Sequence, residues 1–221
     1  LSDAEKIKSV LKEKSFLELK ALWACNDKIT EQNIERLSSM NLKEKLTPAI
    51  LSYDGIAYQY MAPTVFETEM LRYVQEHLRV LSGFYGILKP MDGVSPYRLE
   101  MQAKLEICGA KNLYAYWGDR LYKELRDSSG IIVNLASKEY AKCIEKYLRP
   151  EDRYISCNFY EEAQGKLVQK GVYCKMARGE MVRFMAENRI EEPEEIKLFS
   201  VMGYRFSKDL SSEKEYIFVR K

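Results

Sequence analysis

The most restrictive feature of this 221-residue sequence is a cluster of turn-forming residues near its middle. The chain has only 11 glycines and 6 prolines, yet Gly83, Gly86, Pro90, Gly93 and Pro96 fall within one short segment. Glycine permits positive φ and proline removes a hydrogen-bond donor, so no long regular element is expected to pass through it. We predict a rigid, irregular loop from Gly83 to Glu100, and loops of this kind often carry functional residues.

Before this loop, apolar residues recur at helical spacing. Helices are predicted at Ala4–Lys14, Phe16–Cys25, Thr30–Met40, from Thr47-Pro48 to about Asp54, and from Pro63-Thr64 to Ser82-Gly83. Ser15 and Thr30 are the candidate N-caps, because serine and threonine side chains accept hydrogen bonds from the first free backbone amides.

After the loop, the pattern changes toward strands. Strands are predicted at Ile131–Leu135, Arg153–Phe159, Leu167–Met176, Tyr204–Ser207 and Tyr216–Arg220, with a hairpin turn at Gln164-Gly165, and helices at Arg120–Arg126, from Ser137, at Ala177–Asn188 and at Pro193–Phe199. Neither a repeat nor a linker is evident. The sequence therefore predicts a single mixed α+β domain over residues 1–221, with a helical N-terminal half and a strand-rich C-terminal third.

Composition excludes several classes of protein. Thirty-five basic and 33 acidic residues leave a net charge of +2, and no apolar run approaches the length of about 20 residues that a membrane span requires. Five widely spaced cysteines without a Cys-x-x-Cys pair indicate reduced thiols, and the single histidine, His77, is interpreted as flanking a helix. We therefore expect a cytoplasmic protein with no membrane segment, no metal site and no cofactor.

The positive charge is concentrated locally. Between Lys166 and Arg189 six basic residues face two acidic ones, a net charge of +4. The most informative part of this basic segment is Lys175-Met176-Ala177-Arg178-Gly179, where a strand is predicted to meet a helix. Lys175 and Arg178 beside a helix N-terminus would form a phosphate or carboxylate site, although solvated or ion-paired surface charges are the simpler interpretation.

Two further positions are candidates for chemistry. Asn134 ends a predicted buried strand, where it would either face a ligand or bond its own turn. Arg98 and Glu100 follow Tyr97 directly after the turn-rich segment. Arg98 could hold a phosphate in a bidentate manner, and Glu100 is either a general base or the ion-pair partner of Arg98.

Several motifs together resemble the YaaA peroxide-stress protein family. They are Leu78-Arg79-Val80-Leu81-Ser82-Gly83-Phe84-Tyr85-Gly86-Ile87-Leu88-Lys89-Pro90-Met91-Asp92, Pro96-Tyr97-Arg98-Leu99-Glu100-Met101, Tyr116-Trp117-Gly118, Val133-Asn134-Leu135-Ala136-Ser137, Lys175-Met176-Ala177-Arg178-Gly179 and Gly203-Tyr204. The resemblance extends from about Asp54 to Arg220. It departs at the start, where the strand and loop usual for the family are not found, and we expect them to precede Leu1 in the natural protein.

The resemblance implies a cytoplasmic bacterial protein that limits peroxide damage through iron homeostasis and binds duplex or branched DNA. It also implies a YaaA-like fold with a positively charged central cleft and a helix-hairpin-helix element. Leu51–Ile56, with Gly55 and Ile56 at the turn, is the preferred place for that element. The alternative is Ser82–Gly86.

Two functional hypotheses follow. In the first, the chain binds DNA without sequence specificity through Lys89, Tyr97, Arg98, Lys175, Arg178, Arg183, Gly55 and Ile56. In the second, it is an enzyme acting on nucleic acid or a nucleobase through Arg98, Glu100, Asn134, Lys175 and Arg178, with Glu100, Asn134 and Lys175 as catalytic candidates. A small-molecule ligand is compatible with both.

Overall fold

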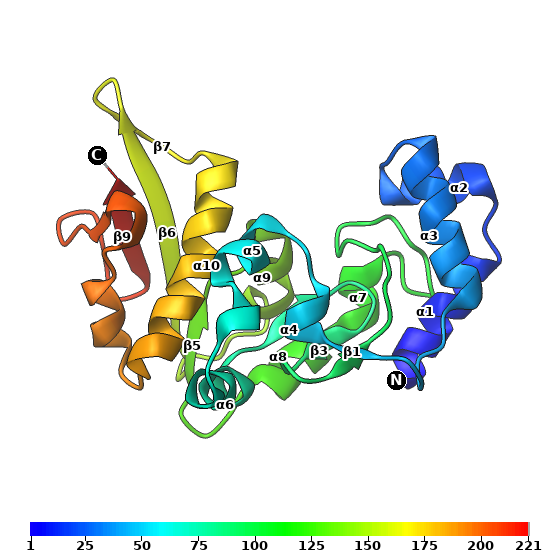
Figure 1. Ribbon diagram of the computed structural model, residues 1–221, viewed down its shortest axis with the longest axis horizontal. Helices are drawn as coiled ribbons and strands as arrows, with labels where there is room; N and C mark the ends of the chain where they lie inside the picture. The colour runs from blue at the N-terminus through cyan, green and yellow to red at the C-terminus, as the bar shows by residue number, and fades with distance from the viewer. Residues whose placement is uncertain (221) are drawn as a thin grey trace. The chain divides into compact units, whose positions relative to one another are not determined.

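In the computed structural model, which describes residues 1–220, the chain forms two compact units. The first unit contains Leu1–Ser52, Arg79–Leu125 and Ser137–Tyr147, and the second contains Tyr53–Leu78, Arg126–Ala136 and the described residues from Leu148 onward. The chain is a mixed α+β protein with its five-stranded sheet in the C-terminal part, which confirms the predicted fold class (Figure 1).

Three helices begin the first unit: α1 (Ser2–Lys12), α2 (Phe16–Trp23) and α3 (Asp27–Ser39). Both α1 and α2 pack against α3. Ser15 caps α2 through a reciprocal capping box with Glu18, as predicted for this serine. The prediction for Thr30 is wrong. Asn26 caps α3 instead, and Thr30 lies buried inside the helix, where its hydroxyl donates to the Asn26 carbonyl.

The remaining elements of the first unit are short: β1 (Thr47–Pro48), α4 (Ala49–Ser52), β2 (Val80–Ser82), β3 (Gly86–Leu88), β4 (Gly93–Val94), α7 (Leu113–Trp117), α8 (Arg120–Leu125) and α9 (Lys138–Glu145). The expected irregular loop thus contains paired strands, because β2 forms a hairpin with β3 and β4 pairs with β1. Gly86 has φ +84, and a Cβ there would lie 2.7 Å from the Trp117 ring. Glycine is therefore required at this turn.

Two predicted helices of the first half are wrong in extent. Thr47-Pro48 forms strand β1 rather than the first turn of a helix. The helix expected over residues 63–83 is replaced by a 3₁₀ turn, η1 (Pro63–Val65), and by α6 (Thr68–His77). Helix α6 ends before Val80 because Val80–Ser82 pairs with Gly86–Leu88, and tertiary pairing overrides helical periodicity.

The second unit is built on the five-stranded sheet. Its strands are β5 (Ile131–Asn134), β6 (Arg153–Ala163), β7 (Lys166–Val168), β8 (Tyr204–Phe206) and β9 (Glu215–Arg220). The order is β5-β6-β9-β8, and β6 runs parallel to both of its neighbours on this path. β7 folds back on the end of β6, and β8 is antiparallel to β9. Gln164 and Gly165 both have positive φ, 52° and 72°, which confirms the predicted tight hairpin turn.

Helix α10 (Gly171–Asn188) packs against β6 and also against α5 (Ile56–Met61) and α6 (Figure 1). Alternate residues of β6, namely Ile155, Cys157 and Phe159, join Ala177 and Met181 of α10 in the core of this unit. Two 3₁₀ segments, η2 (Pro193–Leu198) and η3 (Val201–Gly203), precede β8. No helix within residues 1–220 is both long and apolar enough to cross a membrane.

Candidate nucleic-acid interface

Helix α10 carries the basic residues that the sequence singles out, but it begins earlier than predicted. The strand expected over Leu167–Met176 is wrong: β7 ends at Val168, and α10 starts at Gly171. Lys175 and Arg178 therefore lie in the second and third helical turns, away from the N-terminal amides. The predicted placement of Lys175 and Arg178 beside a helix N-terminus is therefore wrong, and both residues lie on the side of α10.

Gly179 fixes α10 against α5. A Cβ on Gly179 would lie 2.0 Å from the Ala57 carbonyl oxygen and 2.8 Å from the Met61 amide nitrogen, distances that no side chain can occupy. Only glycine allows the two backbones to approach so closely. Its neighbour Arg178 is consequently held beside α5 by a rigid helix contact rather than on a loop.

Arg178 has no counter-ion in the described chain. Its side chain is half-buried, and its Nε is buried without a hydrogen-bond partner. Among residues 1–220 no carboxylate lies within ion-pair distance of its guanidinium. Burial lowers the Arg178 pKa from its ordinary value, although an arginine remains charged. Burying an unpaired charge is unfavourable, so this guanidinium is suited to an anion supplied from outside the chain.

Lys175 lies three residues before Arg178, and residues at this spacing lie on one face of a helix. Lys175 is exposed, and its ammonium group has no ion-pair partner in the part of the chain that the structure describes. The two residues thus present a pair of uncompensated positive charges on one helix face.

The third basic residue predicted on this helix, Arg183, is compensated. Its Nε donates to Glu187 Oε1 at 2.7 Å, one turn further along α10. This exposed pair is an ordinary surface ion pair. Arg183 therefore differs from Arg178, although the sequence assigns both to the same role.

Sequence reasoning missed a group of buried polar side chains in this unit. Glu161 occupies the next inward position of β6 after Phe159 and is only 8% exposed, and Tyr204 of β8 is 0% exposed. Lys170 Nζ contacts Glu161 Oε2 at 2.7 Å, whereas Glu161 Oε1 and the Tyr204 hydroxyl are buried without partners. The period-two pattern Ile155, Cys157, Phe159, Glu161 was the available signal, because it places a carboxylate on the core face.

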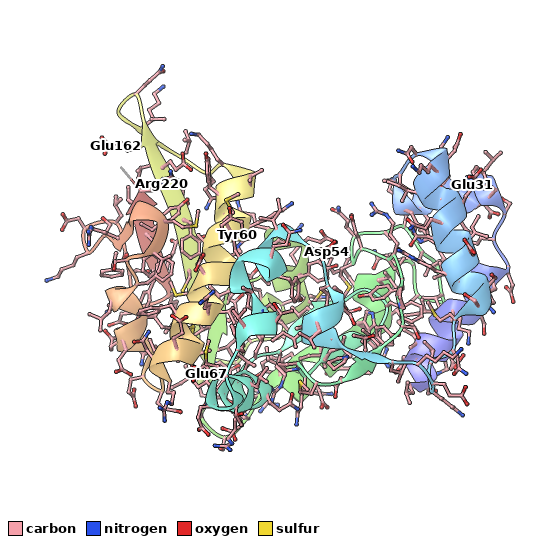
Figure 2. The ribbon with its side chains drawn as sticks, viewed as in Figure 1. Glu31, Asp54, Tyr60, Glu67, Glu162 and Arg220 are labelled. Atoms are coloured by element: carbon pink, nitrogen blue, oxygen red, sulfur yellow. The ribbon has the colours of Figure 1, made fainter. Side chains whose placement is uncertain are left out.

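Cys174 lies among these groups. It precedes Arg178 by one helical turn, and both Arg178 and Glu161 act electrostatically on its thiol. Burial raises the Cys174 pKa, and burial raises the Tyr204 pKa to about 12. Both groups therefore stay protonated at neutral pH. Arg220 of β9, labelled at the end of the sheet in Figure 2, is in register with Glu161 and with Tyr204.

The segment with Gly55 and Ile56 begins α5, the helix that packs on α10. Gly55 has φ −80 and a Cβ there would meet only the Tyr58 ring, at 3.9 Å. Folding therefore does not demand glycine at this position. The alternative place for the hairpin element, Ser82–Gly86, is wrong because this segment joins two β-strands.

Most candidate residues of the first unit already contact other residues of the chain. Arg98 Nε donates to the Trp23 carbonyl at 3.2 Å, and its Nη2 lies 3.8 Å from Glu100 Oε1, which favours the ion-pair interpretation of Glu100. The Tyr97 ring stacks on Phe84 with centroids 5.0 Å apart. Lys89 is exposed without an ion-pair partner among the described residues.

Asn134 has the structural role that the sequence left open. Its Oδ1 accepts from the Ala136 amide at 2.9 Å, and its Nδ2 donates to Ser156 Oγ at 3.2 Å. The side chain thus shapes the turn after β5. The predicted residues therefore fall into two groups: Gly55, Ile56, Asn134, Lys175, Arg178 and Arg183 belong to the second unit, and Lys89, Tyr97, Arg98 and Glu100 belong to the first.

The cysteines and histidine have ordinary surroundings in residues 1–220. All five cysteines are free thiols, and no group of three or more His, Cys, Asp or Glu side chains is arranged to hold a metal ion there. His77 ends α6, where its ring lies 4.4 Å from that of Tyr73 and its Nε2 is 3.5 Å from Glu191.

The fold and the site define a class of protein: a mixed α+β chain of two units with an uncompensated basic face on one long helix. Comparison with known proteins specifies it further. The sequence profile of the peroxide stress protein YaaA family matches residues 1–210, and the chain belongs to this family.

Close relatives are bacterial proteins named UPF0246 protein. The chain is 65% identical over 211 residues to one from Agathobacter rectalis, covering 96% of this chain and 85% of that protein. It is 51% identical over 220 residues to one from Lachnoclostridium phytofermentans, covering 100% and 86%. It is 50% identical over 217 residues to one from Ligilactobacillus salivarius, covering 98% and 88%.

Proposed function

We propose that this chain binds DNA in the bacterial cytoplasm without sequence specificity and thereby limits iron-mediated oxidative damage during peroxide stress. Membership of the peroxide stress protein family supports the physiological setting. The chemistry of α10 supports the ligand, because paired cationic side chains on a rigid element suit a phosphate backbone.

The observation that carries the proposal is the absence of any partner for Arg178 in residues 1–220. A half-buried guanidinium without a carboxylate destabilises the folded state, and an incoming phosphate would provide the missing counter-charge. Lys175 adds a second charge three residues away. Together they would neutralise about two phosphates of a nucleic-acid backbone.

The other proposed contacts have smaller roles. Gly55 and Ile56 begin the helix that adjoins Arg178, where a small residue would let a phosphate approach the backbone. Arg183 shares its charge with Glu187. In the first unit Lys89 is unpaired, whereas Arg98 and Tyr97 are held by Trp23 and Phe84, so these three are proposed as separate and weaker contacts.

The test is the salt dependence of duplex binding, measured by fluorescence anisotropy. We expect affinity to fall steeply with salt, and Lys175→Ala with Arg178→Ala to reduce the slope of log K against log salt by about 2. Lys208→Ala with Lys214→Ala is the matched control, because it removes the same charge from an exposed loop of the same unit. Salt-independent binding, or equal effects of the two double variants, would contradict the proposal.

A further inference from the structure

A hollow lined by lysines lies in the first unit. It has a volume of about 160 Å³ and is formed by residues at the start of α7 and at the end of α9. Three of its lining residues are Lys111, Lys142 and Lys146, and no acidic residue lines it. None of these lysines has an ion-pair partner among the residues that the structure describes.

The fold alone does not explain this concentration of charge. Lys142 and Lys146 are four residues apart, a spacing at which like charges disfavour a helix. Their place at the C-terminal end of α9 offsets that repulsion through the helix dipole. The dipole of α9 does not account for the position of Lys111. This lysine belongs to a separate segment and adds a third positive charge to the same hollow.

The remaining lining is polar and aromatic. The Tyr114 hydroxyl donates to the Glu139 carbonyl at 3.0 Å, which fixes that ring, and Lys146 Nζ lies 5.4 Å from the centre of the Tyr147 ring. Asn112 Oδ1 accepts from the Ala115 amide, so its Nδ2 is the group left to donate. The lysine ammonium groups and the Asn112 Nδ2 group can only donate, and no carboxylate lines the hollow.

We propose that this hollow binds the phosphoryl or pyrophosphoryl group of a phosphorylated ligand. Pockets that enclose whole drug-sized ligands have volumes of roughly 300–1,000 Å³, so this hollow fits a compact anionic group rather than a whole ligand. The group belongs either to a free nucleotide or to a nucleic-acid strand. The proposal is independent of the role of α10, because its residues and those of the α10 face do not overlap.

Titration calorimetry with inorganic pyrophosphate tests the site. We expect saturable binding to the full chain, weakened by about tenfold in each of Lys142→Ala and Lys146→Ala, because each removes a charge-assisted hydrogen bond. Lys138→Ala is the matched control on the same helix, exposed and outside the hollow, and should leave the affinity unchanged. Amide resonances of residues 111–115 and 142–147 should shift on binding.

Two competition experiments distinguish a small ligand from a nucleic acid as the source of the phosphoryl group. Competition by a nucleoside diphosphate would assign the phosphoryl group to a small ligand, and competition by a short single-stranded oligonucleotide would assign it to nucleic acid; either result supports the site. The Lys175→Ala, Arg178→Ala variant should retain pyrophosphate binding. No binding, equal effects of Lys138→Ala and Lys142→Ala, or loss of binding only in the α10 variant would overturn the proposal.

Discussion

Arg98 in the first unit and Arg178 in the second are assigned the same role by the sequence, yet their surroundings are opposite. Arg98 donates to the Trp23 carbonyl and lies near Glu100. Arg178 is half-buried with no partner in the described residues. The difference teaches that pairing, rather than residue type or motif, separates an arginine that stabilises the fold from one available to a ligand.

The largest expected effect concerns the contact that holds Arg178 in place. Gly179→Ala should lower the free energy of unfolding by about 3 kcal/mol, because the new Cβ meets the Ala57 carbonyl at 2.0 Å and α10 must move away from α5. Chemical denaturation measures this. If α10 moves, Arg178 loses its fixed position and its contrast with Arg98 disappears.

Gly55→Ala on the neighbouring helix is the control. A Cβ there meets only the Tyr58 ring at 3.9 Å and φ is −80, so stability should change by less than about 1 kcal/mol. If Gly55 approaches a phosphate, DNA affinity should still fall in this variant. A large loss of stability in Gly55→Ala, or none in Gly179→Ala, would contradict the close approach of the two helices.

The second prediction compares the two arginines directly. Arg98→Met should lower the free energy of unfolding by about 1 kcal/mol, because the Trp23 carbonyl loses its donor. Arg178→Met should leave stability unchanged or raise it, since an uncompensated buried charge is replaced by an apolar side chain of similar length. Duplex affinity should fall by about tenfold in Arg178→Met.

Denaturation curves and anisotropy titrations on the same two preparations check this pair of outcomes. Arg183→Met serves as the reference for an exposed, paired arginine on the same helix. A loss of stability in Arg178→Met equal to that in Arg98→Met would show that Arg178 is structural, and the comparison would no longer hold.

Much of the fold follows from local patterns in the sequence. Strands β5, β6, β8 and β9 of the C-terminal sheet, the Gln164-Gly165 turn and the Ser15 cap were predicted because each depends on neighbouring residues. The start of α10 was not, because Val172 and Tyr173 favour strands. Only the packing of this segment on α5 and β6 makes it helical.

The sequence shows which element carries the excess of basic residues, but not which of these residues are paired in the folded chain. The charge excess between Lys166 and Arg189 correctly pointed to α10 as a basic element. Whether a given cation finds a hydrogen-bond acceptor can depend on residues far away in the chain, as for Arg98 with the Trp23 carbonyl. The lysine hollow joins segments about 30 residues apart, so no local pattern could reveal it.

The smallest expected effect concerns Glu194, which is the opposite of Arg178 in the number of its partners. Arg153 and the Tyr216 hydroxyl each donate to it at 2.8 Å, and Lys197 also contacts it. The hydrogen bonds from Lys197, Tyr216 and Arg153 lower the Glu194 pKa to about 2.

Because the folded-state pKa of Glu194 lies below its unfolded value, its contribution to stability is present above about pH 4.5 and is lost as the pH falls toward 2. Glu194→Gln should therefore lower the melting temperature at pH 6, and the difference from the wild type should shrink steadily below pH 4.5.

Arg178→Met, whose charge has no carboxylate to titrate among residues 1–220, should show no such convergence. Because Glu194 is exposed, the difference at pH 6 should also shrink with added salt. Melting curves that keep a constant separation from pH 6 to 2 would show that Glu194 is not a paired charge whose ionisation stabilises the fold.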